Sequence, residues 1–342
     1  MMKMLAAGVG MRTLRRGMYG GANAATGGME TATSGAGAGV VGSAAKKVSI
    51  NTIRGKYANK IPLTVITAYD FPTASLVSDS GADMLLVGDS LAMVVLGHDN
   101  TKSVTMNEMI HHCKAASRGG KRPFLIGDMP FGSYEPSTEL AVTNAIRFLS
   151  EGGMDAVKLE GGRRMSERVK AIVRAGIPVM GHIGLTPQTA SSLGGYVSQG
   201  RTSKQAVDLL HDALELQNAG CFAVVLEMVP NRVASAITQA LTIPTIGIGA
   251  GSGTSGQVLV FHDMLGLYSS FVPKFCKQYA QLAPPMRTAL TEYVDDVVNR
   301  RFPSENHSFP IKDNELHDFL LAVSRSHPHL SASLSSPSPS VL

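Results

Sequence analysis

The feature that most constrains the fold is a pattern that occurs eight times between residues 63 and 261. Each unit has a short apolar run rich in β-branched residues, a polar residue after it, and a segment of helical character. Runs that are apolar at nearly every position are typical of strands buried on both faces of a parallel sheet. The eight runs span residues 63–68, 83–87, 123–126, 156–159, 177–180, 222–226, 243–248 and 257–261.

The segments between these runs carry helix signals. Residues 105–117, 138–150 and 203–219 have Ser or Thr at or next to their starts and glycine at or shortly after their ends, as helices do. Eight units without a break in composition predict an α/β fold, a (β/α)8 TIM barrel. A doubly wound sheet is the alternative, but the glycine-rich residues 247–253 lie late in the chain and lack the acidic residue that a dinucleotide site places after them.

Both ends of the chain differ from the repeating part. Residues 1–45 contain Arg12, Arg15 and Arg16 with Glu30 as their one acidic residue, which favours a mitochondrial transit peptide over a plain disordered leader. Residues 331–340 (SASLSSPSPS) are too polar to form a core. We therefore expect a leader over 1–45, a catalytic barrel over 46–302, a mostly disordered tail over 303–342, and a mature protein in the mitochondrial matrix.

Charge and cysteine content exclude several function classes. The net charge of +5 comes partly from the leader, and the rest of the chain has 27 basic and 25 acidic residues, so no nucleic-acid partner is expected. The three cysteines lie far apart, which is typical of reduced thiols and not of a disulfide framework or a cysteine zinc site. No run of about 18 apolar residues is present to span a membrane.

Polar residues at the ends of the predicted strands are the candidates for catalysis, because these ends meet at one mouth of a barrel. Singly, each is better explained as a helix cap or a hydrogen-bonded strand end; together, so many acids imply a bound cation, because their mutual repulsion is large. Lys158 lies two residues before one of them. The candidates are Asp70, Asp89, Asp128, Glu160, His182, Glu227 and His262.

The oxygen-rich set favours Mg²⁺, with Asp89 and Asp128 as direct ligands and Glu160 bound directly or through water. Zinc held by His182 or His262 is the weaker alternative, because neither belongs to a closely spaced histidine pair. Mg²⁺ with open positions among acids suits the binding of a 2-oxo acid. It would stabilise the enolate that forms when a base removes the proton from the carbon next to the carbonyl group.

Glu227 ends an otherwise apolar strand, so a raised pKa would fit it for the role of that base. Lys158 would neutralise the carboxylate or the enolate of the substrate. A Schiff base on Lys158 is the competing chemistry.

Six short motifs lie at the strand ends and in the loops that follow them: VGDSL at 87–91, DMPF at 128–131, VKLEG at 157–161, GHIGLTPQ at 181–188, LEMVP at 226–230 and IGIGAG at 246–251. Together, from about Val48 to Arg301, they resemble the ketopantoate hydroxymethyltransferase family. The resemblance implies a magnesium-dependent barrel similar to the phosphoenolpyruvate mutase and isocitrate lyase group. It also implies transfer of a one-carbon unit from 5,10-methylenetetrahydrofolate to 3-methyl-2-oxobutanoate in pantothenate biosynthesis, by a large homo-oligomer such as a decamer.

Position by position, the resemblance places the metal at Asp89, Asp128 and Glu160 and the proton acceptor at Glu227. It places substrate contacts at Asp89, Ser90, Asp128 and Lys158, with His182 nearby. A related magnesium lyase or mutase would be expected to use a cysteine or another acid on a mobile loop after a strand, and neither Cys113 nor Cys221 ends a strand run. A catalytically silent barrel is the remaining alternative, although the costly clustered charges are all present.

Overall fold

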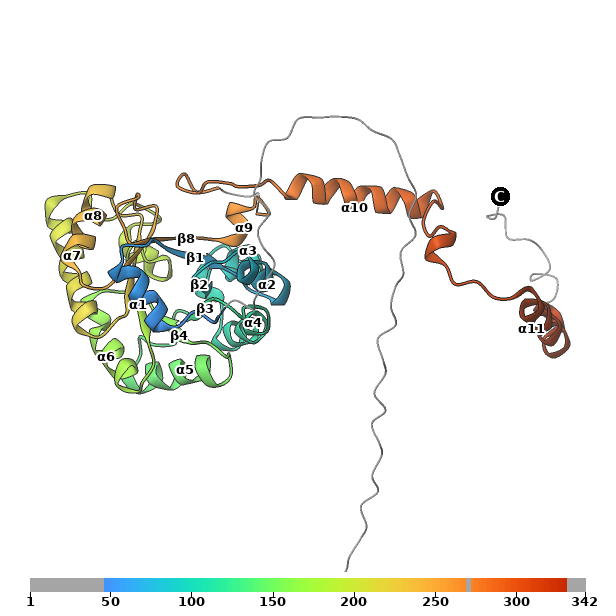
Figure 1. Cartoon of the computed structure of the whole chain (residues 1–342), viewed down its shortest axis with the longest axis horizontal. Coiled ribbons are helices and arrows are strands. Elements are labelled where there is room, and N and C mark those ends of the chain that lie inside the picture. Colours follow the sequence, from blue (N-terminus) through green and yellow to red (C-terminus); the bar gives the residue numbers. More distant parts are fainter. Residues whose placement is uncertain (1–45, 269–271, 331–342) are drawn as a thin grey trace, which may run out of the picture. The chain divides into compact units, whose positions relative to one another are not determined.

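The computed structural model describes residues 46–268 and 272–330. Within them, eight parallel strands close into a barrel in sequence order, and β8 pairs with β1 (Figure 1). The closed barrel confirms the (β/α)8 prediction and rules out the doubly wound sheet. The strands are β1 (Leu63–Thr67), β2 (Met84–Val87), β3 (Phe124–Asp128), β4 (Ala156–Lys158), β5 (Val179–Gly184), β6 (Ala223–Glu227), β7 (Thr245–Ile248) and β8 (Gly256–Leu259).

All eight strands occur where apolar runs predict them, but two boundaries differ in ways that affect the site. β5 continues to Gly184, four residues beyond the predicted end, because Gly181 and Gly184 weaken the sequence signal although their backbones pair with β6. β8 ends at Leu259, before the predicted end at 261, and the Phe261 amide donates to Thr67 Oγ1 at 2.9 Å as a short helix begins. Because β5 continues to Gly184, His182 lies inside this strand and not after its end.

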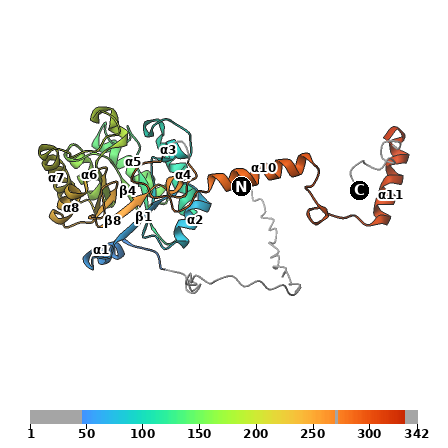
Figure 2. The same ribbon diagram turned by 90° about the horizontal axis from the view of Figure 1, so that it is seen from above.

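The helices of the barrel surround its strands (Figures 1 and 2). The predicted helix over 138–150 is found at Thr138–Ser150, and those over 105–117 and 203–219 are found at Met106–Gly119 and Ser203–Asn218. The α-helices are α1 (Ile50–Ala58), α2 (Phe71–Asp79), α3 (Leu91–Val94), α4 (Met106–Gly119), α5 (Thr138–Ser150), α6 (Ser166–Arg174), α7 (Ser203–Asn218), α8 (Asn231–Ala240), α9 (Phe261–Met264), α10 (Ala283–Val298) and α11 (Asp313–Ser326). Short 3-10 helices cover Thr101–Ser103, Arg163–Met165, Pro187–Leu193, Glu305–His307 and Pro328–Leu330.

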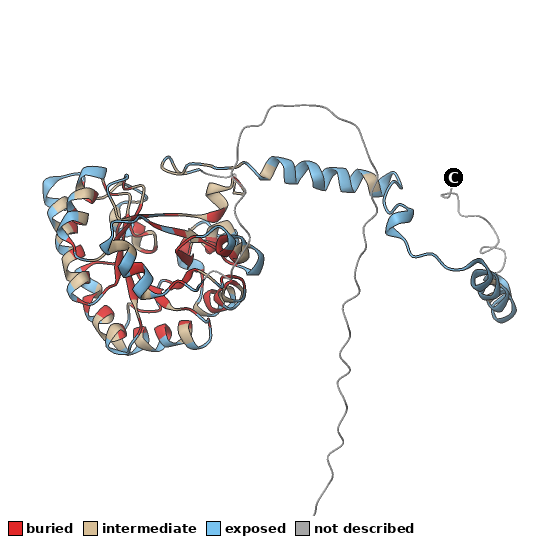
Figure 3. Ribbon diagram, viewed as in Figure 1, coloured by how far each residue is buried: buried red, intermediate tan, exposed pale blue. Residues whose placement is uncertain are grey.

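Side chains of the strands, together with side chains of the helices, form two separate layers of core. One fills the barrel interior and includes Met84, Ile126 and Met180; the other lies between the strands and the helices and includes Leu85 and Phe148. Every residue of β2, β3, β4 and β5 is buried (Figure 3). Burial on both faces explains the near-continuous apolar runs, and it holds the polar strand ends on a rigid frame.

The part of the chain after β8 differs from the expected simple barrel and disordered tail. α10 and α11 have no buried residue, and α11 falls in the segment from 303 onward for which disorder was expected. α11 begins with Asp313 and Glu315 and ends with Arg325, an order of charges that stabilises a helix through its dipole. Residues 1–45 and 331–342, with the predicted leader and Ser/Pro-rich end, lie outside the described residues. No described helix is both long and apolar enough to cross a membrane.

Candidate active site

A cavity of about 500 Å³ opens at the C-terminal ends of the strands. β2, β3, β4, β5 and β6 each contribute charged or polar groups to its wall, from the last residues of the strands or the residues just after them. All seven residues to which the sequence assigned a metal, substrate or base role line this one cavity: Asp89, Ser90, Asp128, Lys158, Glu160, His182 and Glu227.

The two other strand-end candidates lie elsewhere. Asp70 is exposed and caps α2, where its Oδ1 accepts a 2.9 Å hydrogen bond from the Thr73 amide. His262 belongs to α9, and its ring packs 5.5 Å from that of Tyr69. For Asp70 the simple explanation as a helix cap is therefore correct.

Lys158 is the central cation of the site. Its Nζ lies 2.9 Å from Asp128 Oδ1, and both side chains are buried. Burial alone would lower the pKa of Lys158, but the nearby carboxylates of Asp128, Glu160 and Asp89 raise it above its ordinary value. Burial raises the pKa of Asp128 to about 7 despite the opposing effect of Lys158. Lys158 is therefore held as an ammonium ion facing the acids.

His182 connects this cation to the predicted base. Its Nδ1 is 3.2 Å from Lys158 Nζ, and its Nε2 is 3.2 Å from Glu227 Oε2. Burial, together with the Lys158 ammonium, lowers the pKa of His182 well below its ordinary value. Because an ammonium ion can only donate, we assign His182 the neutral form with its proton on Nε2, a buried nitrogen that has no hydrogen-bond partner among the described residues.

Glu227 ends β6 and is only partly exposed to the cavity. Burial raises the pKa of Glu227 to about 8. The positive charge of Lys158 opposes this rise, and the negative charge of Asp89 adds to it. A carboxylate with this raised pKa is a stronger base than an exposed glutamate, as a general base near neutral pH requires. The site thus combines a base, a fixed cation and a group of acids within one cavity.

Gln188 is a buried residue of the site to which the sequence gave no role. Its Nε2 donates to Asp89 Oδ2 at 3.0 Å and to the Met129 carbonyl at 2.9 Å. Its Oε1 accepts a hydrogen bond from the Tyr134 hydroxyl at 2.6 Å. The backbone N–H of Gln188 donates to Glu160 Oε2 at 3.1 Å. One side chain and its backbone therefore fix the orientation of two of the predicted metal-binding carboxylates.

Comparison with known proteins decides the family. The family model described as ketopantoate hydroxymethyltransferase matches residues 47–305, which include the whole cavity wall. The chain belongs to the ketopantoate hydroxymethyltransferase family. It is 56% identical over 256 residues to a 3-methyl-2-oxobutanoate hydroxymethyltransferase of Syntrophobacter fumaroxidans, covering 75% of this chain and 91% of the relative. It is 53% identical over 270 residues to the rice protein "3-methyl-2-oxobutanoate hydroxymethyltransferase 1, mitochondrial", covering 77% and 74% respectively.

A solved structure supports the fold of this family member. Phosphonopyruvate hydrolase superposes with a TM-score of 0.50 at 11% sequence identity, covering 82% of this chain and 99% of the other. This identity is too low to compare activities. The likeness is one of fold, and it agrees with the closed barrel of eight parallel strands.

The donor set of the family member suits magnesium better than zinc. Among the residues that the structure describes, no three His, Cys, Asp or Glu side chains converge to hold a metal by themselves. The Asp89 amide donates to Asp128 Oδ2 at 3.0 Å, so two acids lie side by side. Glu160 Oε1 is buried and has no hydrogen-bond partner among the described residues. Two carboxylates, with substrate and water completing the shell, are how proteins commonly hold Mg²⁺.

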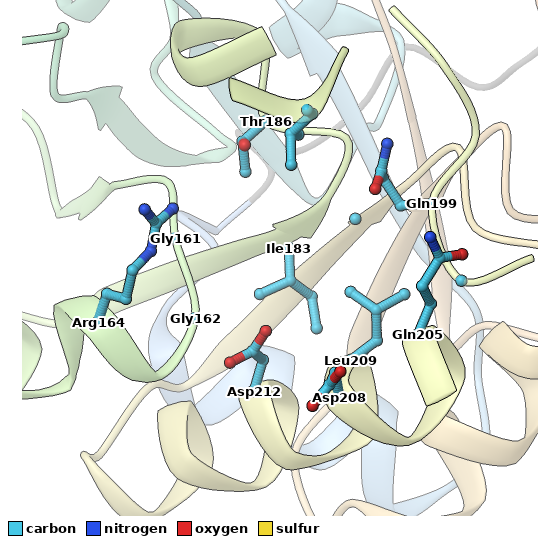
Figure 4. Close-up of a pocket in the computed structure, with 13 residues that line it drawn as sticks. Gly161, Gly162, Arg164, Ile183, Thr186, Gln199, Gln205, Asp208, Leu209 and Asp212 are labelled. Carbon is cyan, nitrogen blue, oxygen red and sulfur yellow. The ribbon is translucent and has the colours of Figure 1, made fainter. Parts of the chain in front are cut away.

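A second, smaller cavity of about 190 Å³ lies beside the loop after β5. Thr186 and Leu193 of this loop line the smaller cavity, whereas Leu185 and Tyr196 line the larger one. Figure 4 shows Asp208 and Asp212 projecting from α7 in the smaller cavity, and both carboxylates accept hydrogen bonds from Arg163. None of the residues with a predicted catalytic, substrate or metal role lines it.

Proposed function

We propose that this member of the ketopantoate hydroxymethyltransferase family transfers a hydroxymethyl group from 5,10-methylenetetrahydrofolate to 3-methyl-2-oxobutanoate. The products are 2-dehydropantoate and tetrahydrofolate, and water supplies the oxygen of the new hydroxymethyl group. The observation that carries this proposal is the position of Glu227, a carboxylate of raised pKa that shares one cavity with a fixed ammonium ion and paired acids. This arrangement suits removal of a proton next to a carbonyl group.

Mg²⁺ is the proposed metal, held by Asp89 and Asp128, with Glu160 binding directly or through water. When bound, it would act as a Lewis acid on the oxo acid and stabilise the charge that develops on its oxygen. The fit rests on the closeness of Asp89 and Asp128, whose charges interact, and on the unpartnered, buried oxygen of Glu160.

Glu227 takes the C3 proton of the oxo acid in this proposal. His182 Nε2 lies 3.2 Å from Glu227 Oε2 without forming a hydrogen bond to it, so the carboxylate keeps its acceptor capacity for the substrate. Because His182 is neutral, it does not hold Glu227 in an ion pair that would weaken the base.

Lys158 acts as a permanent positive charge. Schiff-base chemistry requires a neutral amine, and a raised pKa with an ion pair to Asp128 at 2.9 Å opposes that form. We therefore assign Lys158 to the carboxylate or enolate oxygen of the substrate, together with Ser90 and the acids around the metal.

Location and assembly also belong to the proposal. The relatives from rice and Arabidopsis are named as mitochondrial proteins, which supports the transit peptide inferred from residues 1–45. We place the mature enzyme in the mitochondrial matrix as a homo-oligomer that acts on small molecules.

The test is product formation by the purified full-length chain. With both substrates and Mg²⁺, mass spectrometry should detect 2-dehydropantoate and tetrahydrofolate in equal amounts, and omission of any one component should abolish both. Lys158→Met should lose activity while keeping its cooperative thermal unfolding. Turnover by wild type without the folate donor, or none with all components, would contradict the proposal.

A further inference from the structure

One wall of the active-site cavity contains polar groups that the proposed chemistry does not use. This wall is formed by the end of β8, by α9 and by residues 273–275. A volume of about 500 Å³ is in the range of sites for drug-sized ligands and is much larger than a small oxo acid fills. The cavity therefore has room for a second, larger molecule beside the acceptor substrate.

Asp263 is the charged side chain that α9 contributes to this wall. It is half-buried, and no described residue donates a hydrogen bond to its carboxylate. Burial raises its pKa to about 6, so it is ionised at neutral pH. Because no described residue occupies the acceptor positions of this carboxylate, it can accept hydrogen bonds from the N–H groups of a ligand in the cavity.

The wall is fixed by backbone hydrogen bonds between α9 and the segment that follows it. The Tyr279 amide donates to the Met264 carbonyl at 2.7 Å, and Gln278 Nε2 donates to the Asp263 carbonyl at 3.3 Å. These bonds hold residues 273–279 against α9. Asp263 is therefore placed by a supported element and not by a free loop.

An aromatic ring extends the same wall toward the catalytic base. Phe275 lies so close to Gly249 that a Cβ there would be 2.8 Å from the ring, and Met228 lies nearby. Gly249 has a φ of +64°, a conformation that favours glycine, and its lack of a side chain leaves space for the Phe275 ring. Phe275 thus offers a flat, apolar surface next to the residue that follows Glu227.

We propose that Asp263 anchors the pterin ring of the folate donor by accepting two hydrogen bonds from its 2-amino-4-oxo edge. This inference rests on the proposed function, because it supposes a folate donor. The N3–H and 2-amino N–H bonds of that edge are parallel, and a carboxylate accepts such a pair in bidentate fashion. Phe275 supplies a surface for the flat ring, and exposed Lys274 in the same wall suits the carboxylates of the glutamate tail.

The test is binding of tetrahydrofolate to the full-length chain, measured by isothermal titration calorimetry. Asp263→Asn keeps the size of the side chain but places an N–H donor against the donors of the pterin. We expect it to weaken binding roughly 10- to 100-fold. Asp79→Asn, the same change on the exposed end of α2, is the matched control and should bind like wild type. Equal affinity of Asp263→Asn and wild type would overturn the proposal.

A second measurement on the unmodified protein does not depend on the folding of a variant. A tetrahydrofolate analogue with a methyl group in place of the 2-amino group loses one of the two donors, so wild type should bind it roughly 10-fold more weakly. Equal binding of analogue and parent would overturn the role of Asp263. Failure of wild type to bind tetrahydrofolate at all would overturn the folate donor as well, whereas proton exchange in the oxo acid tests the catalytic proposal separately.

Discussion

Replacing Gln188 by glutamate tests the hydrogen-bond network that orients the predicted metal ligands. The change preserves the size of the side chain and the acceptor for the Tyr134 hydroxyl. It removes the side-chain N–H groups that donate hydrogen bonds to Asp89 Oδ2 at 3.0 Å and to the Met129 carbonyl at 2.9 Å. The new oxygen would face two acceptors, and one of them is an acid.

The magnitude follows from the distance between the charges. Two unit charges about 3 Å apart repel by about 5 kcal/mol at an effective dielectric constant of about 20, so the introduced carboxyl should keep its proton. Its pKa is then raised in the folded state above the unfolded value of about 4.3. The stability loss should be small below pH ~4 and should grow by about 1.4 kcal/mol per pH unit above it, reaching about 3 to 4 kcal/mol at pH 7.

The assay is urea denaturation of wild type and Gln188→Glu at several values between pH 5 and pH 7. Gln205→Glu is the matched control, because Gln205 Oε1 already accepts hydrogen bonds from the Arg201 and Thr202 amides at the start of α7. A carboxylate there should be neutral or slightly stabilising. A stability loss for Gln188→Glu that does not change with pH, or that equals the control, would refute the network described here.

Three further predictions concern the catalytic base and the backbone beside it. Glu227→Gln should slow proton exchange at C3 of 3-methyl-2-oxobutanoate by roughly 10²- to 10⁴-fold, as followed by proton NMR, and full exchange by this variant would exclude Glu227 as the base. The wild-type exchange rate should rise with pH and level off above about pH 8, because the base acts in its ionised form and its pKa is raised to about 8; a rate already constant from pH 6 would contradict that ionisation. Gly184→Ala should lower the free energy of unfolding by several kcal/mol, because its φ is +92° and the new Cβ would lie 2.2 Å from the Glu227 carbonyl oxygen. Gly132→Ala, with a similar φ of +85° but no neighbour within 4 Å, should have a smaller effect in the same denaturation assay.

The sequence predicts those parts of the site that lie where an apolar run meets a polar residue. Asp128 and Glu227 are the last residues of β3 and β6, and Asp89 follows β2 by two residues. The barrel brings such positions to one mouth regardless of loop detail. Their common location therefore follows from the repeat pattern alone.

Other parts of the site depend on tertiary packing that a local pattern does not contain. Gln188 belongs to a 3-10 helix after β5 and reaches Asp89, which is 99 positions away in the chain. The apolar sequence continues through Phe261, although β8 already ends at Leu259. The pattern therefore does not predict the turn into the helix that contains Asp263. Asp70 has the same strand-end signal as the catalytic acids, yet it caps α2. The sequence does not separate these two roles, because aspartate serves both as a helix cap and as a metal ligand.

The measurement that tests the central claim most directly is proton NMR of 3-methyl-2-oxobutanoate in D₂O with the purified full-length chain, first with Mg²⁺ and then with EDTA. The account predicts that the C3 proton signal disappears with Mg²⁺ before any folate is added and persists with EDTA. Persistence of the signal with Mg²⁺, or equal loss after EDTA, would contradict enolate formation by Glu227 beside a magnesium site at Asp89 and Asp128.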